Sequence, residues 1–250
     1  MVQDKTVQAP PGAQNRAKAA AGANPHQAPK QVMIPFAKAK EQAYAHFNAG
    51  RLQAAAQVCA QLVQARPRDA DLHNLMGVIL NAQGNAPAAV KALQRAIHLN
   101  DSNPQFYSNL GEIERQRGKL QEAQVALRRA ISLDPNFAQA LNNLGIVHFD
   151  LRKFEEAVEL YEQAIEANGT YPEAHNNLGN ALRALGKQEE ALEHYQRALL
   201  LRERYPEAYN NLAAVLRDRD QIAEAEHAYR KAISMRPNYL EPYNNLAGMM

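Results

Sequence analysis

The chain has 250 residues and a formal net charge of +2, from 28 basic and 26 acidic side chains. Such a balance argues against a general polyanion binder, so we expect no nucleic-acid partner. Aromatic residues are only 6% of the chain and tryptophan is absent, while alanine supplies much of the 46% hydrophobic content. This composition suits close packing of small-sided helices better than a thick globular core.

The sequence contains one cysteine and shows no recognisable targeting segment. Cys59 is the single cysteine, so no internal disulfide can form. Met1 is not followed by a basic run that leads into an apolar one, and no stretch approaches the ~18 apolar residues of a membrane span. We therefore expect a cytoplasmic protein with no membrane partner.

Residues 1–30 form an Ala/Gln/Pro-rich tail. Pro10, Pro11, Pro25 and Pro29 interrupt it, and it has almost no large apolar side chain to bury. We expect this tail to be disordered and the ordered array to occupy residues 31–250.

A four-residue pattern repeats along the array. Asn142-Asn143-Leu144-Gly145 returns as Asn176-Asn177-Leu178-Gly179, a shift of 34 residues. A fixed period of this size indicates an array of one small structural unit. Six complete repeats (36–239) and the start of a seventh (240–250) are counted from Phe36, Ala70, Pro104, Ala138, Pro172, Pro206 and Leu240.

The repeated residue classes predict two antiparallel helices per repeat. Positions 4, 7, 8 and 11 share one helical face, and position 8 is always Gly or Ala, which lets a second helix approach closely. Small residues at positions 20 and 27 of the second helix, such as Ala157 and Ala164, are expected to form the surface that the first helix contacts. Position 15 is mostly glycine, which permits a positive φ where the first helix ends.

This pattern resembles the tetratricopeptide repeat. The resemblance covers about Phe36 to Met250 and implies an all-α fold, a right-handed α-solenoid of antiparallel helix pairs. It further implies that the first helices line a concave surface. The first repeat departs from the pattern with Gln42 and His46 at packing positions. The last repeat stops after one helix, so we expect the chain to be a cut array, with Leu246, Met249 and Met250 partly open to self-association.

Asparagine recurs at two adjacent positions of the first helix, where it lowers helix propensity. On a helical wheel, position 5 lies opposite the packing face and position 6 on its shoulder. Candidate peptide-binding residues are therefore Asn142, Asn176 and Asn210 at position 5 and Asn109, Asn143, Asn177, Asn211 and Asn245 at position 6.

Two explanations of the asparagines stay open. A side-chain amide offers both a donor and an acceptor, which complement the backbone of an extended peptide. Alternatively, one asparagine per repeat braces neighbouring helices through backbone carbonyls. The Asn-Asn-Leu-Gly form also resembles the repeats that precede the catalytic part of O-linked N-acetylglucosamine transferases and those of bacterial scaffolds. In the transferases an asparagine ladder binds substrate backbone, which implies that role for the position-6 row.

Position 12 adds three cationic candidates for ligand contact, Arg115, Arg183 and Arg217. Acidic residues on the same face outnumber them, so no basic stripe for phosphates is expected. From the repeat that begins at Ala70 onward, positions 2 and 5 hold no lysine that would clamp a C-terminal carboxylate, which argues against the chaperone-binding class of this family.

Residues for catalysis, metal binding or cofactor binding are not grouped in the sequence. Histidines such as His73, His148 and His175 fall at packing positions of separate repeats, and Cys59 falls at core position 24. Tyr161, Tyr195 and Tyr229 recur at that same core position. We therefore predict no catalytic residue, no metal and no cofactor.

Two functions follow from this pattern. The first is a non-enzymatic scaffold that binds other proteins or unstructured peptides along its first helices. The second is the substrate-recruiting N-terminal arm of a larger enzyme, of the O-linked N-acetylglucosamine transferase type. The two share the polypeptide-binding surface and differ in whether a catalytic part follows.

Overall fold

The computed structural model describes residues 7–8 and 33–249. Most of the tail expected at residues 1–30 lies outside the described residues. Within it, β1 (Val7–Gln8) pairs antiparallel with β2 (Met33–Ile34), a contact that the sequence pattern did not predict. The tail boundary stays an expectation.

Helices make up nearly all of the described structure, which confirms the all-α fold class of stacked antiparallel helix pairs. The chain divides into two compact units, Met1–Ile113 and Glu114–Met250. The helices are α1 (Phe36–Asn48), α2 (Leu52–Ala65), α3 (Ala70–Ala82), α4 (Ala86–Leu99), α5 (Pro104–Gln116), α6 (Leu120–Leu133), α7 (Ala138–Asp150), α8 (Phe154–Ala167), α9 (Pro172–Ala184), α10 (Gln188–Leu201), α11 (Pro206–Asp218), α12 (Ile222–Met235) and α13 (Leu240–Ala247).

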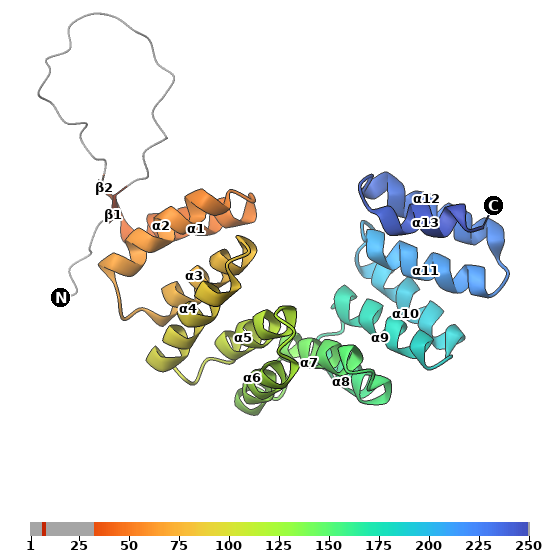
Figure 1. Ribbon diagram of the computed structural model, residues 1–250, viewed down its shortest axis with the longest axis horizontal. Coiled ribbons are helices and arrows are strands. Elements are labelled where there is room, and N and C mark those ends of the chain that lie inside the picture. The colour runs from red at the N-terminus through yellow and green to blue at the C-terminus, as the bar shows by residue number, and fades with distance from the viewer. Residues whose placement is uncertain (1–6, 9–32, 250) are drawn as a thin grey trace, which may run out of the picture. The chain divides into compact units, whose positions relative to one another are not determined.

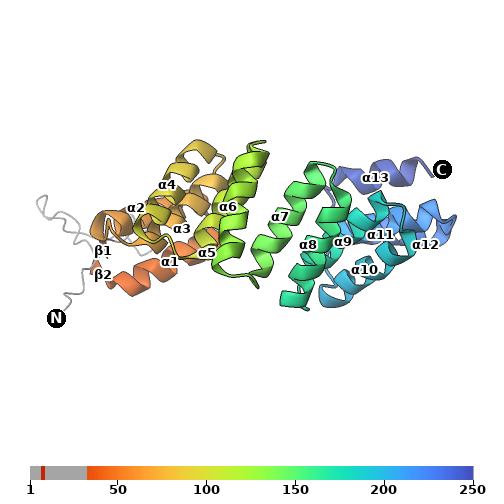
Figure 2. The ribbon, with the colours of Figure 1, turned by 90° about the horizontal axis from the view of Figure 1, so that it is seen from below.

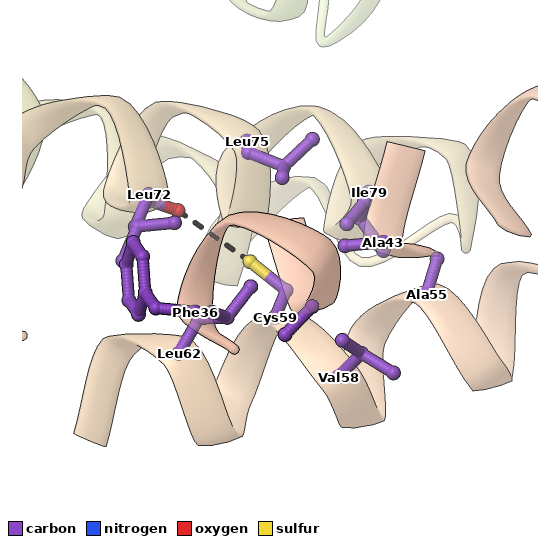
Figure 3. Packing of buried hydrophobic residues seen from close by; sticks show 10 residues of the cluster. Phe36, Ala43, Ala55, Val58, Cys59, Leu62, Leu72, Leu75 and Ile79 are labelled. Carbon is purple, nitrogen blue, oxygen red and sulfur yellow. Dashed lines mark hydrogen bonds between the residues drawn. The ribbon is translucent and has the colours of Figure 1, made fainter. Parts of the chain in front are cut away.

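The first unit contains α1 to α4 and most of α5. The pairs α1/α2 and α3/α4 pack internally, and α2 also packs on α3 (Figure 1). Its core joins Phe36 and Leu62 to Leu72 and Ile79 (Figure 3). The Sγ of Cys59 donates to the backbone oxygen of Leu72 at 3.5 Å, and burial raises the thiol pKa to about 12. Cys59 is thus buried, as its core position predicts, and a raised pKa disfavours the reactive thiolate.

The second unit contains the end of α5 and α6 to α13. In this unit α6 packs on α7, and each second helix from α8 onward packs on its own first helix and on the first helix that follows (Figure 2). Successive first helices also touch, because α7 contacts α9, α9 contacts α11 and α11 contacts α13. The first helices of this unit therefore form one continuous layer.

The turn inside each pair has the backbone that the glycines at position 15 predict. Gly50, Gly84, Gly118 and Gly186 all have positive φ. Arg152 and Asp220 occupy the same position with φ of 60° and 65°. The turn geometry is thus imposed by the helix pair even where the residue is not glycine.

Glycine at position 8 serves a close helix contact, but the partner differs from the expected one. Ala157 and Ala164 are fully buried, yet the atoms nearest Gly145 belong to the Tyr161 ring. A Cβ added at Gly145 would lie 2.6 Å from Cε1 of Tyr161, and Gly179 meets Tyr195 in the same way. The small residue therefore makes room for a buried aromatic ring, which confirms these tyrosines as core residues.

The last helix lies partly open. Leu246 and Met249 are half-buried against the cluster of Ala213, Ala228 and Tyr229. Leu240 is 71% exposed, and Met250 lies outside the described residues. Self-association through this helix remains a prediction.

Candidate functional site

The layer of first helices brings positions 5 and 6 of consecutive repeats together. In each pair, the Nδ2 of the position-6 asparagine donates to the Oδ1 of the position-5 asparagine one repeat earlier. The bonds are Asn177 to Asn142 at 2.9 Å, Asn211 to Asn176 at 3.0 Å and Asn245 to Asn210 at 3.1 Å in the second unit, and Asn109 to Asn74 at 2.8 Å in the first.

These bonds change the interpretation of position 5. The wheel placed Asn142, Asn176 and Asn210 opposite the packing face, but they are only 3%, 5% and 2% exposed. The placement is wrong because the next first helix packs laterally against this side, which a wheel for one helix does not show. The bracing itself differs from the expected form, since it joins two side-chain amides and not an amide to a backbone carbonyl.

Position 6 remains accessible. Asn109, Asn177, Asn211 and Asn245 are half-buried, whereas Asn143 is 8% exposed and accepts from Asn142 Nδ2 at 3.4 Å. A side-chain amide has two N–H donors and an acceptor oxygen. The bond to position 5 uses one donor, so the second N–H and the oxygen of Asn177 and Asn211 have no protein partner among the described residues.

The position-12 arginines bind carboxylates, two of them across repeats. Arg115 donates to Asp150 at 3.0 Å, and Arg183 donates to Asp218 at 3.0 Å. Arg217 donates to the other oxygen of Asp218 at 2.9 Å. The sequence pattern placed these arginines as ligand contacts, but it did not identify the position-13 aspartates that they hold.

A pocket of about 400 Å³ opens where this ion pair is missing. Phe149 stands at position 12 and Ala184 at position 13 of the following repeat, so neither side chain is charged. The pocket is lined by Phe149, Asn180, Arg183, Ala184, Gln188 and Asp218. Sequence reasoning missed it, although the alternation of charged and apolar pairs at positions 12 and 13 would have marked it.

A histidine pair lies between α9 and α10. The Nδ1 atoms of His175 and His194 are 3.1 Å apart, and their rings are stacked. Burial lowers the pKa of His175 to about 4, with the charge of His194 and Arg197 adding to the effect. Burial also lowers the pKa of His194. His175 was expected at a packing position, and the pairing with His194 is new.

Metal-binding clusters and membrane-spanning helices are both absent from the part of the chain that the structure describes. The described residues contain no group of three or more His, Cys, Asp or Glu placed to hold a metal ion. Among the described helices, none is both long and apolar enough to cross a bilayer.

Known families match most of the array. Models described as "Tetratricopeptide repeat" match residues 40–105, 136–204 and 170–238, and a model described as "TPR repeat" matches residues 111–152. No curated protein sequence matches the chain.

Solved structures share the fold at low sequence identity. A chain of the APC/C hetero-tetramer Cut9-Hcn1 is 18% identical, with a TM-score of 0.80 over 86% of this chain and 43% of that one. PilF of Pseudomonas aeruginosa is 17% identical, with a TM-score of 0.71 over 85% of this chain and 97% of that one. YrrB, described as "a TPR protein with an unusual peptide-binding site", is 19% identical, with a TM-score of 0.54 over 76% and 98%. This chain thus spans less than half of the Cut9-Hcn1 chain that it matches.

Proposed function

The chain belongs to the tetratricopeptide repeat family, and we propose that it is a non-enzymatic scaffold whose position-6 asparagines hold extended polypeptide. The observation that supports this is the half-exposed amide that recurs on successive first helices. Asn177, Asn211 and Asn245 each use one N–H for bracing and keep a second N–H and an oxygen. The peptide-binding site named for YrrB agrees with a peptide ligand.

A row of amides suits polypeptide backbone because each peptide unit offers one donor and one acceptor. The bond to position 5 fixes the orientation of each amide before the ligand arrives. A pre-oriented group loses less conformational entropy on binding than a mobile one. Bracing and binding are therefore joint roles of the same side chain, which unites the two explanations left open by the sequence.

The test uses two double variants that remove the same hydrogen bonds. Asn177→Ala with Asn211→Ala deletes the half-exposed amides, and Asn142→Ala with Asn176→Ala deletes their buried acceptors. Each lost ligand contact is worth about 0.5–1.5 kcal/mol, so the first pair should weaken binding roughly tenfold. The second pair removes only the orientation of those amides, so it should weaken binding clearly less than the first pair does. The probe is a pool of unstructured, dye-labelled peptides of random sequence, measured by fluorescence anisotropy.

Circular dichroism melting of both double variants provides the control for folding. If both pairs lower affinity equally, or neither does, the position-6 amides do not contact ligand. The asparagines would then be structural residues alone.

The substrate-recruiting arm of a glycosyltransferase-like enzyme remains the alternative proposal. The polypeptide substrate of such an enzyme would bind the same amide row, the position-6 side chains of Asn177, Asn211 and Asn245. The experiment above therefore tests the polypeptide binding that both proposals share. A glycosyl-transfer assay on the complete gene product separates the two, because only the enzyme arm predicts that the position-6 variants reduce transfer to protein substrates.

A further inference from the structure

The pocket beside Phe149 interrupts a regular pattern in the second unit. On one side of it the repeats are tied by Arg115 and Asp150, and on the other by Arg183 and Asp218. Between them, Phe149 and Ala184 stand where the neighbouring interfaces have an arginine and an aspartate, and a pocket of about 400 Å³ lies beside them. Within the second unit, this interface therefore differs from its two neighbours in having no ion pair between positions 12 and 13.

The pocket lies on the helix face that presents the amide row. Asn180 and Ala184 follow Asn177 by three and seven residues on α9, which is about one and two helical turns. A rise of about 1.5 Å per residue puts Asn180 and Ala184 roughly 5 and 10 Å along the axis from Asn177. A polypeptide held by Asn177 and Asn211 would thus pass within one side-chain length of the pocket.

The charged residues that line the pocket are Arg183 and Asp218, and a second arginine outside the lining shares this aspartate. Asp218 accepts from Arg183 through one oxygen and from Arg217 through the other, so two guanidinium groups share one carboxylate. Neighbouring charges on α10 are paired, because Lys187 lies 3.6 Å from Glu190 and Arg219 binds Glu189. Because Asp218 is shared between two guanidinium groups, it neutralises Arg183 only in part.

The remaining walls combine an apolar surface with an oriented amide. Phe149 and Ala184 supply an aromatic ring and a methyl group. The Oδ1 of Asn180 accepts from the buried hydroxyl of Tyr195 at 2.8 Å, which leaves its Nδ2 as a donor at the pocket. An occupant with an apolar stem and an anionic end matches this arrangement.

We propose that this pocket receives a glutamate side chain of the polypeptide bound along the amide row. The methylene groups of the glutamate would cover Phe149 and Ala184, and its carboxylate would accept from Arg183 and from Asn180 Nδ2. The inference rests on the proposed scaffold function and adds sequence preference to it. A charge-assisted bond to a guanidinium is among the stronger side-chain contacts, so one such subsite is enough to select ligands.

The experiment compares three pools of unstructured, dye-labelled peptides that differ only at one central residue, which is Glu, Gln or Phe. The parent chain should bind the Glu pool about fivefold tighter than the Gln pool at low salt. The preference should shrink at high salt because the rim is open to solvent. The Phe pool should bind no tighter than the Gln pool.

Ala184→Asp places a carboxylate at the wall of the pocket and restores the aspartate that two other repeats have at this position. It should abolish the preference for Glu and leave the affinity for the Gln pool unchanged. Ala167→Asp on the exposed end of α8 adds the same charge away from the pocket and should keep the preference. Circular dichroism of both variants confirms that they are folded.

The outcomes separate this inference from the scaffold proposal. Equal affinity for all three pools, tighter binding of the Phe pool, or a preference for Glu that survives Ala184→Asp would overturn the glutamate pocket and leave backbone binding in place. Absence of binding to every pool would overturn both. A preference lost in Ala184→Asp and kept in Ala167→Asp supports the pocket.

Discussion

The Nδ2 of Asn211 donates a hydrogen bond to the Oδ1 of Asn176 at 3.0 Å and so joins α11 to α9 across one repeat. Because a repeat of this kind contacts only its neighbours, such bonds belong to the interface energy that couples one unit to the next. The same contact recurs between Asn177 and Asn142. The amide row is thus a part of the fold as well as the candidate binding surface.

A double-mutant cycle on this pair should show a measurable coupling. Asn176→Ala and Asn211→Ala each improve helix propensity but leave a polar group without its partner. We expect a coupling free energy of about 0.5–1.5 kcal/mol in urea unfolding at equilibrium. Additive effects of the two substitutions would show that the bond contributes nothing to the stability of the array.

Two tyrosines at position 24 should respond differently to loss of the hydroxyl. The Tyr195 hydroxyl donates to Asn180, whereas the Tyr229 Oη is buried without a hydrogen-bond partner in the described structure. Position 9, which is Asn180 in one repeat, is Ala214 in the next. Tyr195→Phe should lower the free energy of unfolding by about 1 kcal/mol, and Tyr229→Phe should leave it unchanged or raise it. Each variant is the control for the other, and equal losses in urea unfolding would contradict the assignment.

Gly145→Leu should disrupt the contact between α7 and α8. Any side chain there meets the Tyr161 ring, because even a Cβ would lie 2.6 Å from it. Overpacking of this kind destabilises by about 1–3 kcal/mol, and unfolding should divide into two steps because repeats couple only to neighbours. Gly145→Ala, which adds a smaller side chain, is the control and should lower the free energy of unfolding by less. One unshifted transition in denaturant would refute the packing described here.

Two substitutions at position 15 should change the melting temperature in different directions. Gly186 has a φ of 79°, and no atom lies within 4 Å of the Cβ that an alanine would add, so Gly186→Ala adds backbone strain of about 1 kcal/mol without a steric clash. Asp220 already has a φ of 65°, and Asp220→Gly relieves that strain and removes a carboxylate near a helix C-terminus. We expect the first to lower the melting temperature and the second to leave it equal or higher. The reverse order in calorimetry would argue against the turn geometry.

The histidine pair should make the array less stable in acid. Burial holds the pKa of His175 at about 4, while an unfolded histidine titrates near 6.5. Between these values the unfolded state binds more protons, so the free energy of unfolding falls as the pH falls from about 6.5 to about 4. His175→Gln should flatten this part of the pH profile, whereas His227→Gln at an exposed site serves as the control. A parent profile that is already flat over this range would contradict the buried pair.

The repeat sequence was sufficient to predict the local structure. The period of 34 residues, the glycines at position 15 and the small residues at positions 8, 20 and 27 give helix pairs with defined turns. These features depend on contacts within one repeat, where the spacing along a helix fixes which side chains meet. The helix pairs and their positive-φ turns were therefore predictable from the sequence.

Only the tertiary structure decided which asparagine is buried and which is exposed. A wheel assigns residues to the faces of a single helix, but a first helix in this stack is covered by its own partner and by the first helices beside it. Asn176 is buried because α11 packs laterally on α9, and Asn211 reaches back to it for the same reason. The pocket at Phe149 and Ala184 likewise exists only where three repeats meet, since residues from α7, α9 and α11 form its walls.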